Sequence, residues 1–103
     1  MERPERNPGV TVCAETGCGK MYITDNTASE YPEIFIELGK SGGCAKSMCQ
    51  FIARLISFSL RAGIPKERII HAGLGVRCHT PKISGGKEIL SCADAIAKVL
   101  EEK

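Results

Sequence analysis

The sequence predicts an α+β domain in which a small antiparallel sheet of N-terminal strands is packed by one long helix and two shorter helices. Two observations lead to this prediction. Apolar and polar residues alternate in three segments within the first 38 residues, as is typical of strands with one buried face. The only long segment with helical periodicity follows at residues 41–61, so the strands precede the helices along the chain.

The predicted strands lie around residues 10–12, 21–24 and 33–38, and the third is expected to pair with the second as a hairpin. Residues 16–19 separate the first two strands and contain a cysteine between two glycines. Glycines in this position permit a tight turn or a bulge, so we expect the thiol of Cys18 to be exposed there.

Residues 41–61 predict a helix of about five turns. Ser41 or Gly42 would cap its start, and the sequence Gly63-Ile64-Pro65 would end it. Steps of three and four residues define the predicted core face, which consists of Met48, Ile52, Leu55, Ile56 and Ser59 with Cys49 and Phe51 at its sides.

Two arginines seven residues apart lie on another face of this helix. Arg54 and Arg61 share that face with Gln50 and Ser57. A solvated face is the expected interpretation, and contact with a partner protein is the alternative.

Two shorter helices are predicted after the long one. The first covers residues 65–72, with proline at its first position and Gly73 at its C-terminal cap. Residues 74–78 are expected to be extended, and residues 79–90 to form a loop. The last helix should run over residues 91–101, with Ser91 as N-cap and Asp94 in the third helical position, as in a capping box.

The 103 residues are sufficient for one domain, which we place at residues 10–103 after a flexible N-terminus at residues 1–9. A net charge of +2 gives no indication of a nucleic-acid surface or of binding to an anionic membrane. No apolar run reaches the roughly 18–20 residues of a membrane span, and the first residues lack the apolar core of a signal peptide. We therefore expect a cytoplasmic protein.

Six cysteines in a reducing compartment indicate metal or redox chemistry more often than disulfides. Cys18, Cys44, Cys78 and Cys92 each lie at the boundary of a predicted element, and Cys44 and Cys92 lie at helix starts, which favour thiolates. Four thiolates would suit tetrahedral zinc or an iron–sulfur cluster, although the spacing is not that of a zinc ribbon and buried structural cysteines are the alternative.

The remaining two cysteines have a different setting. Cys13 lies at the end of the first predicted strand, and Cys49 lies within the long helix beside its core face. For both, we expect core or half-buried packing.

At these residues the sequence resembles the TSCPD domain, named for a Thr-Ser-Cys-Pro-Asp signature. The matching segments, in chain order, are TGCGKMYIT at 16–24, EIFIELGKSGGCA at 33–45, ARLISFSLRAGIP at 53–65, GLGVRC at 73–78 and SCADAIAKVL at 91–100. Carried over by position, the family's recurrent cysteines fall on Cys18, Cys44, Cys78 and Cys92. The signature departs from the family in reading Leu90-Ser91-Cys92-Ala93-Asp94, without the Thr and the Pro.

TSCPD domains occur at the C-terminus of vitamin B12-dependent (class II) ribonucleotide reductases and as stand-alone proteins. The resemblance implies an accessory metal-binding module that serves deoxyribonucleotide synthesis and DNA replication, with zinc as the metal. Its implied partners are the reductase's catalytic chain or thiol reductant, and a nucleotide is a further candidate. The family links the chain to ribonucleoside-diphosphate reductase activity. However, 103 residues leave no room for the barrel, the radical-bearing segment or the cobalamin site, so we expect no catalysis by this chain alone and name no catalytic residue.

A looser similarity is to iron–sulfur scaffold proteins of the NifU/IscU type. It rests on the glycine-flanked Cys18, the Gly-Cys at the start of the long helix, and the late cysteine followed by Asp-Ala-Ile. It implies a NifU/IscU-like fold with an iron–sulfur cluster, and Asp94 or His79 as an extra ligand. The alternatives to the accessory module are therefore an iron–sulfur scaffold or carrier, and a thiol redox protein that uses pairs such as Cys78 and Cys92.

Overall fold

A computed structural model describes residues 2–17, 19–39, 43–78, 82–84 and 87–102. It contains five strands and three helices within these residues. In chain order they are β1 (Val10–Thr16), β2 (Gly19–Asp25), β3 (Ile34–Leu38), α1 (Gly43–Arg61), α2 (Lys66–Gly73), β4 (Lys82–Ser84), β5 (Lys87–Ile89) and α3 (Cys92–Glu101). This order of a three-stranded sheet followed by helices confirms the predicted α+β class.

The main sheet is antiparallel in the order β1-β2-β3, so the predicted hairpin pairing is confirmed. Val12 pairs with Ile23, and Ile23 pairs with Ile36, which places these three side chains on the same face. This face is buried, whereas the alternate residues, such as Tyr22, point to the opposite, exposed face. One solvent-exposed face and one buried face account for the alternation of polar and apolar residues in the sequence.

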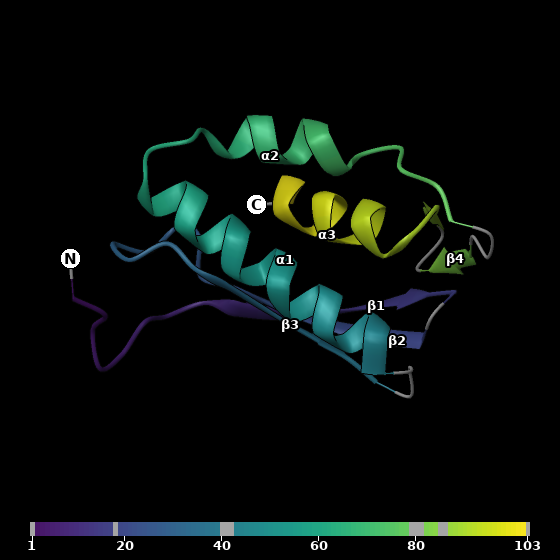
Figure 1. Cartoon of the computed structure of the whole chain (residues 1–103), viewed down its shortest axis with the longest axis horizontal. Coiled ribbons are helices and arrows are strands. Elements are labelled where there is room, and N and C mark those ends of the chain that lie inside the picture. The colour runs from purple at the N-terminus through teal and green to yellow at the C-terminus, as the bar shows by residue number, and fades with distance from the viewer. Residues whose placement is uncertain (1, 18, 40–42, 79–81, 85–86, 103) are drawn as a thin grey trace.

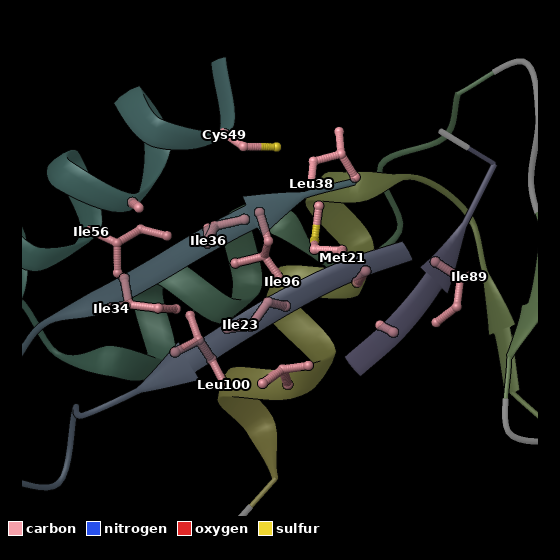
Figure 2. Close-up of a cluster of buried hydrophobic side chains, with 14 residues drawn as sticks. Met21, Ile23, Ile34, Ile36, Leu38, Cys49, Ile56, Ile89, Ile96 and Leu100 are labelled. Carbon is pink, nitrogen blue, oxygen red and sulfur yellow. The ribbon is translucent and has the colours of Figure 1, made fainter. Parts of the chain in front are cut away.

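All three helices lie on the buried side of the sheet (Figure 1). Helix α1 contacts β3, α3 lies across β1 and β2, and α2 contacts α3. Figure 2 shows the resulting core, in which Ile96 and Leu100 of α3 join Ile23 and the other sheet residues in one cluster. The molecule is therefore a two-layer sandwich, with α1 and α3 as its principal covering helices.

The predicted core face of α1 is correct for Ile56, which is buried, and for Ile52, which packs partly buried against the core, but it is wrong for Met48 and Leu55. Cys49, Ala53, Ile56 and Ser57 are buried, whereas Met48 and Leu55 are about half exposed. The burial of Ser57 has a clear reason. Its hydroxyl accepts the Ile34 N–H at 2.9 Å and donates to the Ala53 carbonyl at 2.8 Å. Because β3 is an edge strand, one side of its backbone has no neighbouring strand to hydrogen-bond. The Ser57 hydroxyl of α1 supplies a partner for the Ile34 N–H on that side.

Three predictions for the segment after α1 need correction. Pro65 lies just outside α2 as its N-cap, and Gly73 is the last helical residue rather than the cap. A Cβ on Gly73 would lie 3.0 Å from the Ala97 Cβ and 3.1 Å from the Ala93 carbonyl oxygen, so glycine lets α2 approach α3 closely. The predicted loop at 79–90 instead contains the β4–β5 hairpin, whose short strands carry no clear alternation in the sequence.

The N-terminal segment is joined to the sheet by hydrogen bonds to one carboxylate. Arg3 donates twice to Glu33, at 2.9 and 3.2 Å, and Asn7 donates to it at 2.8 Å. The flexibility expected of residues 1–9 stays a prediction. In the part of the chain that the structure describes, no helix combines the length and apolar character needed to cross a bilayer.

Candidate functional site

The first turn of α3 is fixed by Ser91, which is buried. Its hydroxyl accepts the Asp94 N–H at 3.1 Å, which confirms Ser91 as the N-cap. The same hydroxyl donates to the carbonyl of Val76 at 2.6 Å. One side chain therefore caps the helix and attaches it to the segment that leads to Cys78.

Asp94 joins the same two segments from within the helix and is only 1% exposed. Its carboxylate accepts the Gly75 N–H at 2.9 Å and the Leu90 N–H at 3.0 Å, and it forms an ion pair with Lys98 at 2.8 Å. Gly75 has a φ of 83°, a conformation that suits glycine and turns its N–H toward the carboxylate. In a capping box, the side chain at the third helical position would accept the N–H of the N-cap residue, here Ser91. The Asp94 carboxylate instead accepts the N–H groups of Leu90 and Gly75.

These contacts determine the charge state of Asp94. Burial by itself raises the pKa of a carboxyl group, but the hydrogen bonds from Lys98, Gly75 and Leu90 and the charge of Lys98 outweigh burial and hold the pKa of Asp94 below its ordinary value. Both carboxylate oxygens are engaged, so Asp94 is poorly suited to the role of an extra metal ligand.

Cys92, the first residue of α3, is partly buried against the β1–β2 hairpin. Its thiol donates to the hydroxyl of Thr16 at 3.6 Å, and the Thr16 hydroxyl donates to the Gly19 carbonyl at 2.9 Å. Thr16 and Gly19 flank the turn in which Cys18 stands in the sequence. Cys92 is therefore positioned beside the end of β1, and Cys18 lies outside the described residues.

The segment with Cys78 reaches the same end of the molecule. The Cys78 N–H donates to the Leu90 carbonyl at 3.0 Å, two residues before Cys92. Cys44, the second residue of α1, is exposed, and its carbonyl accepts from the Ser47 hydroxyl at 2.9 Å. The starts of α1 and α3 and the adjoining ends of β1 and β2 all lie toward the end of the molecule opposite the N-terminus (Figure 1).

The described cysteines do not form a ligand set by themselves. Among the residues whose positions are given, no three or more His, Cys, Asp or Glu side chains are grouped to hold a metal ion. Cys44, Cys78 and Cys92 therefore do not complete such a group without a further residue. Cys18 and His79, which the sequence also proposed, lie outside the described part of the chain.

Of the predictions for the other two cysteines, one is confirmed and one is wrong. Cys49 is buried between α1 and the sheet, as predicted. Cys13 is exposed, and the prediction of packing for it is wrong. It lies in the middle of β1 rather than at its end, and because Val12 and Ala14 lie on the core side, alternation directs Cys13 to the outer face.

Sequence reasoning missed three polar residues that organise the structure. Thr16 is buried beneath Cys92, Ser57 serves the edge of β3, and buried Glu33 holds Arg3 and Asn7. Burial by itself raises the pKa of Glu33, but the hydrogen bonds from Asn7 and Arg3 lower it below its ordinary value. None of the three is part of a sequence motif with a recognisable spacing, because each forms a hydrogen bond with a residue far away in the sequence.

A family model described as the TSCPD domain matches residues 1–103. The chain belongs to the TSCPD domain family. No curated protein and no solved structure gives a significant match, so the similarity to NifU/IscU-type proteins stays a prediction.

The geometry explains how this TSCPD domain tolerates its departures from the signature. At Leu90, where the signature has Thr, the hydrogen bonds to the site come from the backbone. The Leu90 N–H donates to the Asp94 carboxylate, and the Leu90 carbonyl accepts from the Cys78 N–H. Ala93 replaces Pro in the first turn of α3, where proline would only aid initiation. The Ser, Cys and Asp of the signature are present, and their side chains join α3 to two other segments.

Proposed function

We propose that this TSCPD domain is an accessory module of class II ribonucleotide reductase whose Cys18, Cys44, Cys78 and Cys92 hold a metal ion, with zinc preferred and an iron–sulfur cluster as the alternative. The family match over residues 1–103 supports the association with the reductase. The contact of Cys92 with the hairpin that contains Cys18 supports the ligand assignment most directly.

The chemistry of the donor set fits a soft or borderline metal. Cys44 and Cys92 lie in the first turns of α1 and α3, and cysteine sulfur is the ligand that zinc and iron–sulfur clusters take in such sites. Ser91 and Asp94 hold the segments of Cys78 and Cys92 together, so they would act as positioning residues. A bound metal would supply a cross-link between sheet and helices, and thereby folding free energy.

The metal assignment is tested by elemental analysis of protein purified without oxygen. We expect about one zinc per chain in the wild type, loss of that zinc in Cys92→Ser, and its retention in Cys13→Ser. Cys13 is the matched control because its thiol lies on the outer face of the sheet. Iron with acid-labile sulfide would select the cluster instead, and no metal, or equal loss in both variants, would refute the assignment.

The association with the reductase needs a separate test. The TSCPD domain should bind the class II catalytic chain of its own host, or that enzyme's thiol reductant, in a direct titration of purified proteins. Absence of binding to both, with the domain shown to be folded, would contradict the accessory role. Addition of a nucleotide to the same titration would show whether a nucleotide strengthens the complex.

A second candidate function is thiol redox chemistry by Cys78 and Cys92. It is favoured by the backbone bond from Cys78 to Leu90, which brings the two cysteine segments together. Rapid alkylation of both thiols in reduced protein and protection of both after oxidation would support it. Thiols blocked by tightly held zinc would exclude it.

A further inference from the structure

Helix α1 carries a second apolar stripe that faces away from the sheet. Its members are Met48, Phe51, Leu55 and Phe58, at successive steps of three, four and three residues. Their exposed fractions are 52%, 55%, 46% and 60%. Single exposed apolar residues are ordinary, but four in a heptad spacing on one helix are typical of a surface that packs against another helix.

An apolar groove adjoins this stripe. It lies between α1 on one side and α2 and α3 on the other, with a volume of about 250 Å³. Apolar side chains line it, including Ile52, Leu55, Ile69, Ala72, Ile96 and Leu100. Leu55 belongs to both the stripe and the groove, so the two form one continuous apolar surface along the outer side of the helix layer.

The charged side chains of α1 are all basic. Helix α1 contains Lys46, Arg54 and Arg61 but no Asp or Glu. The Arg61 guanidinium donates a hydrogen bond to the Pro32 carbonyl at 3.0 Å, and its central carbon lies 4.4 Å from the centre of the Tyr31 ring. Arg54 is exposed and has no ion-pair partner among the described residues. Since Arg54 lies three residues after Phe51 and four before Phe58, it borders the stripe on the helix surface, and it also lines a groove beside β3 together with Glu37.

This charge distribution disfavours a second copy of the chain as the occupant. Two α1 helices packed antiparallel through this stripe would bring Arg54 of one copy close to Arg54 of the other, without a carboxylate on either helix to compensate. A helix with apolar residues at heptad spacing and carboxylates beside them would instead match both the stripe and Arg54.

We propose that the α1 stripe and the adjoining groove form a docking surface for an acidic amphipathic helix of another protein. The surface adjoins the cysteine segments, because Met48 follows Cys44 by one turn of α1 and Ala93 lines the groove next to Cys92, but the proposal rests on the apolar side chains and Arg54 and on no property of a cysteine. The proposal therefore stands whether or not the cysteines hold a metal, and it does not rest on the association with the reductase.

The test uses the full chain and two labelled helical probe peptides of about three heptads. Both carry leucine at the core positions, and the flanking positions are all Glu in one peptide and all Lys in the other. Fluorescence anisotropy should show that the Glu peptide binds at least about tenfold more tightly than the Lys peptide, with affinity falling as salt rises. Phe51→Ser should weaken binding of the Glu peptide by about tenfold or more.

Two further variants keep the test decisive if Phe51→Ser folds poorly. Arg54→Glu alters only an exposed charge and should remove the preference for the Glu peptide. Tyr22→Ser removes an exposed aromatic residue from the opposite face of the molecule and should leave binding unchanged. Equal binding of both peptides, or equal loss in Tyr22→Ser, would overturn the proposal. So would a wild-type dimer, seen by light scattering, that Phe51→Ser converts to monomers.

Discussion

Helices α1 and α3 use their apolar residues in different ways. Of the ten residues of α3, six are buried: Asp94, Ala95, Ile96, Ala97, Val99 and Leu100. Of the nineteen residues of α1, only four are buried, and four of its large apolar side chains, Met48, Phe51, Leu55 and Phe58, lie on the outer face. The difference teaches that α3 belongs to the core of the fold, whereas α1 packs on one edge strand and leaves an apolar face exposed.

The largest effect that separates the two helices should come from a matched pair of leucines. Leu100 of α3 is fully buried, and Leu55 of α1 is 46% exposed. Leu100→Ala should lower the free energy of unfolding by about 3–5 kcal/mol, because it removes core contacts and leaves a cavity. Leu55→Ala should lower it by less than about 1 kcal/mol. Chemical denaturation of the two variants measures both values, and similar losses would remove the distinction.

The next effect concerns the carboxylate that attaches α3 to its neighbours. Asp94→Asn should lower the free energy of unfolding by about 2–3 kcal/mol, because it removes the ion pair with Lys98 and turns an amide donor toward a backbone N–H. Glu37→Gln, on the exposed face of the sheet, is the control and should change stability by less than about 0.5 kcal/mol. A loss in Asp94→Asn no larger than in the control would show that Asp94 does not hold these segments together.

The smallest effect is a loss of stability at acid pH. The pKa values of Asp94 and Glu33 lie below their ordinary values of 3.8 and 4.5 in the folded protein. Their ionised forms therefore stabilise the fold above those ordinary values, and this contribution is lost as the pH falls through the folded pKa values. Denaturation curves from pH 6 to pH 3 should show the decline, and Asp94→Asn should show a shallower one. An equally steep loss of stability in Asp94→Asn would show that titratable groups other than Asp94 cause the effect.

The sequence predicted the sheet better than the helix faces, for a physical reason. Each strand has one wet face and one dry face, so alternation alone locates Met21 and Ile23 in the core. Helix α1 has two apolar stripes, and residue size favoured Met48 and Leu55 over the small residues that face β3. Close packing on an edge strand requires Ala53 there, and the backbone of β3 requires the hydroxyl of Ser57.

At the candidate site, local spacing was informative and distant contacts were not. The three-residue step from Ser91 to Asp94 predicted the cap of α3. The bond from Asp94 to Gly75 joins residues 19 apart, and the bond from Cys92 to Thr16 joins residues 76 apart. Such contacts arise from the tertiary arrangement, so no local pattern in a single sequence indicates them.

Amide hydrogen exchange, followed by mass spectrometry with and without the Glu peptide, tests the contrast between the two helices most directly. In the free protein, the amides of α3 should exchange only on global unfolding, and those of α1 should exchange faster. The peptide should increase protection in α1 and α2 and leave the sheet unchanged. Slower exchange in α1 than in α3, or peptide-induced protection centred on the outer face of the sheet, would contradict the account.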